Sequence, residues 1–519
     1  MINCGPASAG RTLRYRRTAM KTTFLFLLTA LLMGCGDRTT SGDDTDSRSE
    51  SGSDSNGTDG TDGTDGTDTE DTETEDTEDT DTDADGDGAC GDIVTFETGI
   101  VPQTEIHVAV DGDDTTGNGS ADAPFATVEH AASHAGPGTA IRIHGGTYAG
   151  GIYLSGLAGT AEAPIWIGGT ADERPVIEGD VEGLHLSEVR YVIIHDLEIR
   201  NASGNGLNCD DGGDTANPEA TRHVVLRNLF IHDIGTGGNE DCLKLSGVND
   251  YFVLDSEMAF CGGSGGGSAI DHVGCHNGLL AGNHLHDLSA NAIQCKGGSA
   301  NIEIRGNWMA SAGERAVNMG GSTGFEFFRP PLSASAPNVE ARDIRLVANV
   351  IIGGAAAFAF VGCVACAAVN NTVYLPQQWV FRILQETVST DDYTFSACAD
   401  NLVANNIFFF SREQISTHVN IGPDTLPETF AVENNLWYAV DSPNASAQTD
   451  LPAAEVEPLI GLDPGFDVPA DTLSIDHFSI SSSSPAWMAG REYEYLSGDF
   501  TGACWMDPPS LGAREYRPD

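Results

Sequence analysis

The chain has 519 residues, with 77 Asp or Glu against 25 Lys or Arg, and its formal net charge is −52. Residues 37–92 hold 22 acids and two Arg, so residues 93–519, with 55 acids and 18 Lys or Arg, still carry −37. A domain this acidic repels nucleic acid, and it binds a polyanionic glycan only through a bound cation or a local basic patch. The length is ample for one large folded domain.

The N-terminus has the pattern of a bacterial export signal. A basic stretch ending at Lys21 precedes an apolar run over residues 22–34, which is too short to span a bilayer and fits a signal peptide. The run ends in Leu-Met-Gly-Cys, which resembles a lipobox. We expect residues 1–35 to be a signal peptide that starts at Met20, with Cys35 lipidated and the protein held in the bacterial envelope, at the outer membrane or cell surface. A plain cleaved signal is the alternative.

An acidic linker follows the signal. Residues 36–93 consist mostly of Ser, Thr, Gly, Asp and Glu, with Thr-Asp-Gly repeated from Thr58 to Asp68. This composition supplies no apolar core, and its like charges repel one another. We predict a disordered spacer that holds the folded part away from the membrane.

The rest of the chain carries a strand pattern that recurs. Five short segments each begin with an aliphatic residue, alternate with period two and precede a second strand-like run. They are 207–211, 243–247, 270–274, 293–297 and 317–321. Recurring strands with a shared column pattern are typical of a parallel β-solenoid. We predict an all-β parallel β-helix over residues 94–460, closed by residues 461–519 of the same domain.

The second residue of each segment defines an outward column. When the aliphatic first residue points into the core, the next points to solvent, and stacked strands about 4.8 Å apart align these residues into a ladder. The predicted ladder consists of Asn208, Lys244, Asp271, Gln294 and Asn318. The chain has only three lysines, and the two beyond Lys21, Lys244 and Lys296, lie in or beside this ladder. We therefore predict a functional groove here; a surface ion pair between Lys244 and Asp271 is the structural alternative.

A polar residue recurs where each coil bends between two apolar strands. The positions are Asp196, Asn228, Ser256, Asn283, Asn307, Asn349, Asn371, Asn406 and Asn435. Recurrent Asn at a bend predicts a stacked turn, in which side-chain amides bond from one coil to the next. We interpret this column as structural.

Both ends of the repeat region have informative patterns. A strand pattern at 105–110 and a short helix pattern at 129–134 predict a cap over the first coil. With the Gly- and Pro-rich turns beside them, and with Leu511-Gly-Ala-Arg-Glu-Tyr516 near the end, they resemble secreted β-helix proteins of the pectate-lyase-like and chondroitinase B/alginate lyase groups. The resemblance implies a right-handed, single-stranded parallel β-helix with a short N-terminal capping helix. It implies little about activity, because many specificities share this scaffold.

Residues 291–307 look like the lysine-bearing coil of the chondroitinase B/alginate lyase family. In that family a Lys is the general base, an Arg of the next coil assists, and calcium neutralises the substrate uronate. Mapped by position, Lys296 takes the role of the base. The place of the family's Arg reads Val317-Asn-Met-Gly320 here. The Arg is missing there, and Arg315, which points the same way in a strand, is the predicted substitute.

β-Elimination of a uronic-acid glycan explains these residue types. The proton at C5 lies beside a carboxylate, whose charge calcium or an Arg must offset, and the base must be neutral. A nearby cation lowers the pKa of a lysine, whereas Asp271 raises it. The loop over residues 323–338 brings Arg329 beside the ladder, where we expect it to bind substrate together with Lys244, Asp271, Gln294 and Asn318.

Several other side chains could hold a metal. We predict a calcium site in the loops, with carboxylate ligands Asp210, Asp211, Asp214, Glu240 and Asp241. The paired Asp210 and Asp211 also fit a polygalacturonase, but the other signatures of that family are absent. Four histidines, His272, His276, His284 and His286, alternate between faces and coils, and we interpret them mostly as turn and surface residues.

Ten cysteines remain beyond Cys4 and Cys35, an even number that favours disulfides in an exported protein. Cys363 and Cys366 could form a short-range disulfide, and Cys209 and Cys295 fall in an inward column. The sequence thus predicts a monomeric lipoprotein that engages an acidic polysaccharide and contacts the membrane only through its lipid. The leading function is a calcium-assisted polysaccharide lyase, and the alternative is a non-catalytic glycan-binding or structural envelope protein.

Overall fold

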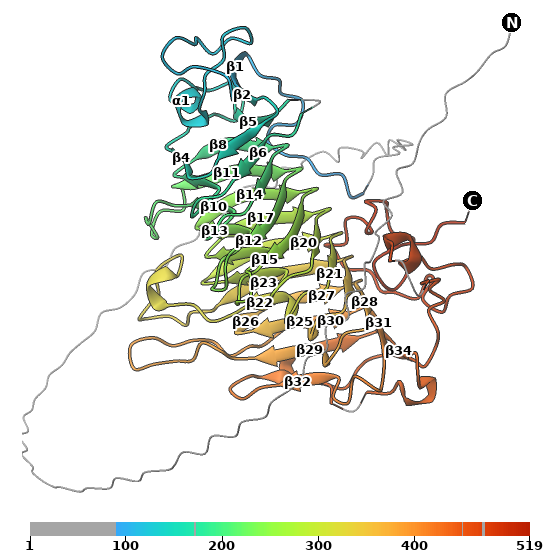
Figure 1. The fold of residues 1–519 in the computed structure, drawn as a ribbon. Coiled ribbons are helices and arrows are strands. Elements are labelled where there is room, and N and C mark those ends of the chain that lie inside the picture. Colours follow the sequence, from blue (N-terminus) through green and yellow to red (C-terminus); the bar gives the residue numbers. More distant parts are fainter. Residues whose placement is uncertain (1–89, 171–172, 449, 470–472, 519) are drawn as a thin grey trace, which may run out of the picture. The chain divides into compact units, whose positions relative to one another are not determined.

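A computed structural model describes residues 90–170, 173–448, 450–469 and 473–518 (Figure 1). The chain divides into two units, residues 1–83 and 84–519, and the fold below is that of the second. The predicted signal peptide, Cys35 and nearly all of the acidic linker lie outside the described residues. Among the described helices, none has the length and apolar character needed to cross a bilayer.

Three parallel sheets form the body of this unit (Figure 1). They contain 13, 10 and 12 strands, and nearly every coil contributes one strand to each sheet. Two successive coils show the pattern, with strands β13 (Leu243–Ser246), β14 (Val248–Leu254), β15 (Glu257–Cys261), β16 (Ile270–Val273), β17 (His276–Ala281) and β18 (His284–His286). Each strand pairs in parallel with its counterpart one coil away, so the chain forms the predicted parallel β-helix.

A short helix covers the N-terminal end of the coils. Helix α1 (Val128–Ala132) lies between β1 (Thr104–Val108) and β2 (Thr139–Ile143), close to the predicted strand and helix. The Thr127 side chain caps it by accepting a hydrogen bond from the His130 amide. Its buried Val and Ala side chains join the first coils, so the end of the apolar core is not left open to water.

Columns of aliphatic and aromatic side chains fill the interior. The first residues of the repeated segments stack as predicted on the 10-stranded sheet, and each is at most 1% exposed. They are Leu184, Leu207, Leu243, Ile270, Ile293, Val317, Phe358 and Phe381. Full burial of one such side chain contributes about 1.5–3 kcal/mol, and the column fixes which face of each strand turns outward.

The asparagine turn exists as a buried ladder. From Asn283 to Asn435, each amide donates from Nδ2 to the Oδ1 of the Asn one coil further on, at 2.9–3.0 Å. The last amide donates to Glu455 at 2.8 Å, so a carboxylate ends the series. These contacts satisfy backbone and side-chain groups that water cannot reach.

Two members of the predicted turn column were assigned wrongly by one position. Asp196 and Asn228 have φ of 55° and 50°, and they match Asp255 (φ 47°), the residue before Ser256. The buried ladder position in their coils holds leucine: the Leu229 amide donates to Ser256 Oγ at 3.1 Å. On each of these coils, a residue with left-handed backbone conformation directly precedes the ladder residue. Asp and Asn tolerate that conformation, so from the sequence they were mistaken for the ladder residue itself.

Two disulfides form among the described cysteines, at pairs that the sequence did not predict. Cys90 bonds to Cys504 and Cys242 to Cys261. Cys363 and Cys366 are not bonded to each other; they are buried thiols, as are Cys209 and Cys295, which lie in the inward column as predicted, and Cys275 and Cys398.

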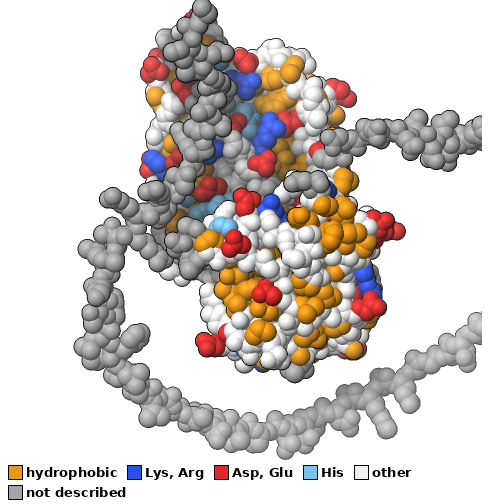
Figure 2. Space-filling view, turned by 90° about the vertical axis from the view of Figure 1, so that its right-hand side faces the viewer, with side chains coloured by type: hydrophobic (Ala, Val, Ile, Leu, Met, Phe, Trp, Pro, Cys, Tyr) orange, Lys and Arg blue, Asp and Glu red, His pale blue; other side chains and the backbone are white. Residues whose placement is uncertain are grey.

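Residues 461–519 follow the last strand, β35 (Leu459–Ile460), and hold one described short helix, η4 (Ile475–Phe478). They pack back on the 12-stranded sheet, where Phe478 and Ala513 join Val350 and Ile352 in one apolar cluster. Figure 2 shows large apolar areas with acidic and basic groups interspersed on the face that it presents.

Asn349→Ala should lower the free energy of unfolding by about 3 kcal/mol, because the Asn349 amide donates to Ile304 O and Asn371 Oδ1 and its oxygen accepts from Asn307. Denaturant titration measures the loss. Asn444→Ala, at an exposed position, is the control and should change stability by at most about 0.5 kcal/mol. Equal effects of the two substitutions would contradict a stabilising ladder.

Candidate functional site

The predicted outward ladder exists with the predicted register. On β10 (Leu207–Asp210), β13, β16, β19 (Ile293–Lys296) and β22 (Arg315–Gly320), the directly paired residues are Asn208, Lys244, Asp271, Gln294 and Asn318. The ladder continues in both directions along the sheet, through Tyr153 and His185 at one end and Ala359, Arg382 and Asn420 at the other. It is therefore a continuous stripe across ten coils.

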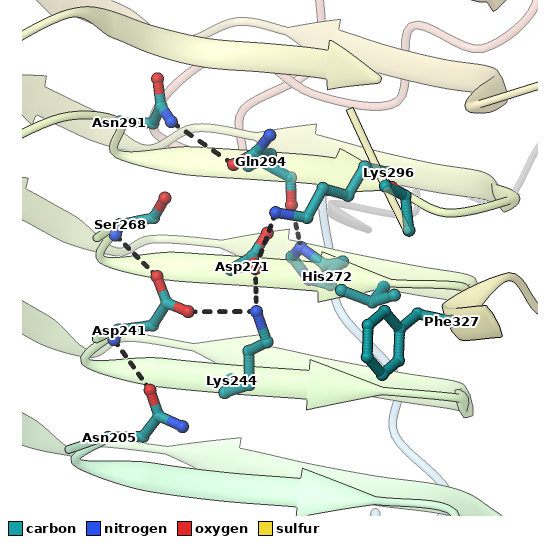
Figure 3. Close-up of polar contacts among 12 residues, drawn as sticks. Asn205, Asp241, Lys244, Ser268, Asp271, His272, Asn291, Gln294, Lys296 and Phe327 are labelled. Carbon is teal, nitrogen blue, oxygen red and sulfur yellow. Dashed lines mark hydrogen bonds and ion pairs between the residues drawn. The ribbon is translucent and has the colours of Figure 1, made fainter. Parts of the chain in front are cut away.

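Lys244 and Lys296 share one carboxylate. Lys296 lies two residues after Gln294 and so points to the same outward face. Asp271, which is 1% exposed, lies between the two lysines: Lys244 Nζ donates to its Oδ2, and Lys296 Nζ lies 3.3 Å from the same atom (Figure 3). The two lysines of the folded part thus lie side by side on one face of the sheet, as predicted.

A second carboxylate completes the cluster. Asp241 Oδ2 accepts a hydrogen bond from Lys244 at 3.2 Å, and its Oδ1 accepts one from the Ser268 amide at 2.7 Å (Figure 3). The Asp241 amide donates to Asn205 Oδ1 at 2.9 Å, which fixes the bend before β13. Two ammonium groups and two carboxylates therefore alternate in a region where every member is mostly buried.

The charges shift one another's pKa values. Burial disfavours charged Lys244, but attraction by Asp271 and Asp241 outweighs burial and raises the pKa of Lys244 well above its usual value. Burial and the charge of Asp271 raise the pKa of Asp241 to about 6. Burial opposes the ionisation of Asp271 too, but Lys244 and Lys296 outweigh it and lower the pKa of Asp271. Lys244 and Asp271 thus form a permanent ion pair, and Asp241 titrates just below neutral pH.

A loop from further along the chain supplies a third cation. Arg329 donates to both oxygens of Asp211, from Nε at 2.7 Å and Nη2 at 2.9 Å, and from Nη1 to Phe327 O at 2.7 Å. It lies against the turns of two coils: a Cβ at Gly274 would come 2.4 Å from Arg329 Cβ, and one at Gly247 would come 3.0 Å from its Nε. Glycine at both turns lets the loop approach the coils closely.

These elements enclose a cavity of about 480 Å³. Its walls include the three cations, amide and carboxylate groups, and one aromatic ring: Lys244, Lys296, Arg329, Asn205, Asn208, Asn239, Asp210, Asp211 and Phe327. A neighbouring cavity of about 520 Å³ lies beyond Asp211 and Arg329, which line both. The bidentate pair therefore separates two compartments of one surface.

Arg315 is not among the residues that line this cavity. It begins β22, whereas Lys296 ends β19, so the two lie about five residues, or about 16 Å, apart along the strand direction. Its guanidinium donates to Glu386 at 2.8 Å and to Asn318 at 3.1 Å. The structure therefore brings Arg329, not Arg315, beside Lys296. Gln294 and Asn318 occupy the ladder but likewise do not line the cavity.

The five carboxylates predicted to hold calcium do not converge. Arg329 donates to Asp211, and Lys244 donates to Asp241. Asp210 accepts hydrogen bonds from the Ser187 hydroxyl and the Gly212 amide. Its Oδ2 also lies 2.7 Å from His185 Nε2. Asp214 accepts from Asn217, and Glu240 from the Gly238 amide. Among the described residues no three of them form a common ligand set. Calcium binds several oxygen ligands in one place, and these carboxylates are dispersed and already hydrogen-bonded, so this group of residues does not fit that ion.

One neighbour of the cavity has no place in the sequence-based prediction. His185, one coil before Asn208 in the ladder, contacts Glu182 at 2.8 Å through Nδ1 and Asp210 at 2.7 Å through Nε2. Its segment, Leu184-His-Leu-Ser187, has the same alternation as the five repeated segments. That alternation is the signal that could have placed His185 in the ladder.

No protein-family model and no curated protein matches the sequence. Among solved structures, the fold is similar to that of pectate lyase Pel9A, with 15% identity, a TM-score of 0.50, and 81% of this chain and 98% of that chain covered. An alginate lyase from Paenibacillus sp. str. FPU-7 has 18% identity and a TM-score of 0.39, covering 61% and 97%. The similarity to the pectate lyase confirms the predicted right-handed parallel β-helix and, at this identity, speaks for the fold alone.

Lys244→Met should destabilise the protein by about 3–5 kcal/mol, because it leaves Asp241 and Asp271 buried with only Lys296 to offset them. Lys296→Met is the matched control and should cost less, since Asp271 keeps Lys244. Denaturant titrations at neutral pH compare the two, and adding Asp271→Asn to Lys244→Met should recover part of the loss. A larger cost for Lys296→Met would contradict the assigned ion pairs.

Proposed function

We propose that the cavity beside the lysine pair binds an acidic polysaccharide and that the protein is a polysaccharide lyase. The observation that carries this proposal is the convergence of Lys244, Lys296 and Arg329 on one cavity. Residues 93–519 carry −37, so a polyanion is repelled over most of the surface and attracted only where cations gather. Both lysines of the described chain contribute to that one place.

In the proposed β-elimination each group has a role. Lys244, held in its charged form, offsets the uronate carboxylate and so makes the neighbouring C5 proton more acidic. Lys296, after its ammonium has given one proton to water, accepts the C5 proton as the C4–C5 double bond forms, the C4–O bond breaks, and the departing oxygen takes a proton from water. Phe327, which is 53% exposed at the cavity, offers a ring for a sugar face. No step in this scheme uses calcium, because Lys244 supplies the positive charge that offsets the uronate.

A non-catalytic glycan-binding protein is the second candidate. This candidate is favoured because both amines contact Asp271. Such paired charges suit a rigid binding surface as well as they suit a catalytic site. For either function we propose that Cys35 carries a lipid and that the acidic linker holds the β-helix outside the membrane.

The lyase should release unsaturated uronate from at least one member of a panel of alginate, pectate and glycosaminoglycans, detected by its ultraviolet absorbance. Lys296→Ala should lower kcat/KM by about 10²–10⁴-fold, and Lys296→Arg should be equally inactive yet still bind glycan, because a guanidinium does not lose its proton. A chelator should leave the activity unchanged; loss of activity that calcium restores would show that the predicted metal is required. No product from any glycan that binds would establish the binding protein instead.

Binding of the acidic glycan should tighten by about threefold to tenfold as the pH falls from about 7.5 to about 5. Asp241, with its pKa raised to about 6, takes up a proton in this range and the site gains positive charge, whereas the pKa of Asp271 is lowered and it stays ionised. Calorimetric titrations at the two pH values measure the change. Asp241→Asn should flatten it, and a neutral glycan should show none; an unchanged pH dependence in the variant would remove Asp241 as its source.

A further inference from the structure

A second polar cluster lies on the 12-stranded sheet, away from the lysine ladder. Glu257 on β15 pairs directly with His284 on β18, and His286 follows two residues later on the same outward face. Ligand atoms of these three side chains lie within 4.8 Å of one another. Sequence reasoning interpreted both histidines as surface residues; the stacking of coils brings them to one carboxylate.

The ring of His286 is already oriented. Its Nδ1 lies 2.9 Å from Asp287 Oδ2, and its Nε2 lies 3.3 Å from Glu257 Oε1. Because a carboxylate only accepts, the ring without an ion donates from Nδ1 to Asp287 and from Nε2 to Glu257. An ion would replace the Nε2 proton between the ring and Glu257, while Asp287 keeps the proton on Nδ1. A carboxylate behind a histidine is the usual support of a metal-binding imidazole. A tetrahedral ion with bonds of about 2.0–2.1 Å separates neighbouring ligand atoms by about 3.3 Å, as Nε2 and Oε1 are separated here.

Small and aromatic side chains flank the two histidines. In the strand register His286 is paired with Ala259 on one side and Ala310 on the other, and both have small side chains. On the other side, Trp308 stacks on His284 with ring centroids 4.3 Å apart, which holds that ring in place. The ring nitrogens of His284 make no hydrogen bond to any described residue, so a lone pair is free there.

We propose that Glu257, His284 and His286 bind a divalent transition metal ion such as Zn²⁺, Ni²⁺ or Cu²⁺. Two imidazoles and one carboxylate suit ions of this class, whereas calcium prefers an all-oxygen shell. The ion links two successive coils beside the closing segment, so it stabilises the folded chain by mass action.

The neighbouring coil provides a natural comparison. Phe230-Ile-His232-Asp233 repeats the pattern of His284-Leu-His286-Asp287. His232 contacts Asp233 at 2.6 Å and Glu198 at 3.3 Å, as His286 contacts Asp287 and Glu257. Phe230 stands where the second imidazole would be, with its ring 4.1 Å from that of His232. Two residues therefore separate the arrangements. Phe230 stands in place of His284, and Arg200, which bonds to Glu198 at 2.8 Å, stands beside His232 where Ala259 stands beside His286.

The experiment is calorimetric titration of the untagged folded chain with ZnCl₂, NiCl₂ and CaCl₂. We expect one equivalent of Zn²⁺ or Ni²⁺ to bind and to raise the Tm, with no saturable binding of Ca²⁺ at this cluster. His284→Phe and Glu257→Gln should each weaken binding at least about tenfold, and Asp287→Asn by about tenfold. His232→Gln, the matched control, should leave binding unchanged.

Phe230→His combined with Arg200→Ala should add a second equivalent by recreating the cluster around Glu198 and His232, since Arg200 no longer occupies Glu198. No folding defect can mimic this gain. The proposal is overturned if the wild-type chain binds neither Zn²⁺ nor Ni²⁺, or if His284→Phe, folded by circular dichroism, binds them with unchanged affinity and stoichiometry. It is also overturned if His232→Gln removes the wild-type binding.

Discussion

The in-register stacking of parallel strands is the constraint on which this structure depends. Aliphatic columns decide which face of each strand is buried, and the amide ladder from Asn283 to Asn435 fixes the height of each bend on its neighbour. With both fixed, the outward residue of one coil must lie beside its counterpart on the next. Lys244 therefore meets Asp271 without any long-range feature of the sequence to direct it.

That constraint also explains how an acidic protein holds two amines side by side. Lys244 and Lys296 stand on either side of Asp271, and Asp241 binds Lys244 from the bend, so the two amines are close together without unrelieved repulsion. Paired charges that are mostly out of water are screened little by salt. In the function that we propose, a glycan carboxylate meets amines already held in place, so less side-chain entropy is lost on binding.

The part of the site that follows from register could be predicted, and the part that depends on loop geometry could not. The period-two pattern was enough to place five ladder residues. It also placed Lys244 and Lys296 on the same face of the sheet. Arg329 lies 118 residues from Asp211 in the sequence, at the tip of a loop whose path no periodicity encodes. The prediction for Arg315 was wrong because two side chains that face the same way can still lie far apart along the strand direction. Asp196 and Asn228 were misplaced because their residue types suit a left-handed bend as well as a ladder.

Each coil has three outward faces, one on each sheet, and a substitution on one face leaves the side chains of the other two faces in place. The lysine ladder belongs to the 10-stranded sheet and the histidine cluster to the 12-stranded sheet, so their side chains share no column. Within the 12-stranded sheet, the His–Asp pair with a Glu from the previous coil occurs twice, and only the later copy has gained a second imidazole in place of Phe230. Repetition thus places a His–Asp pair beside a Glu on two coils, and the residues paired with them differ. Arg200 occupies Glu198 in the earlier copy, whereas Ala259 leaves Glu257 to the two imidazoles that we propose as metal ligands.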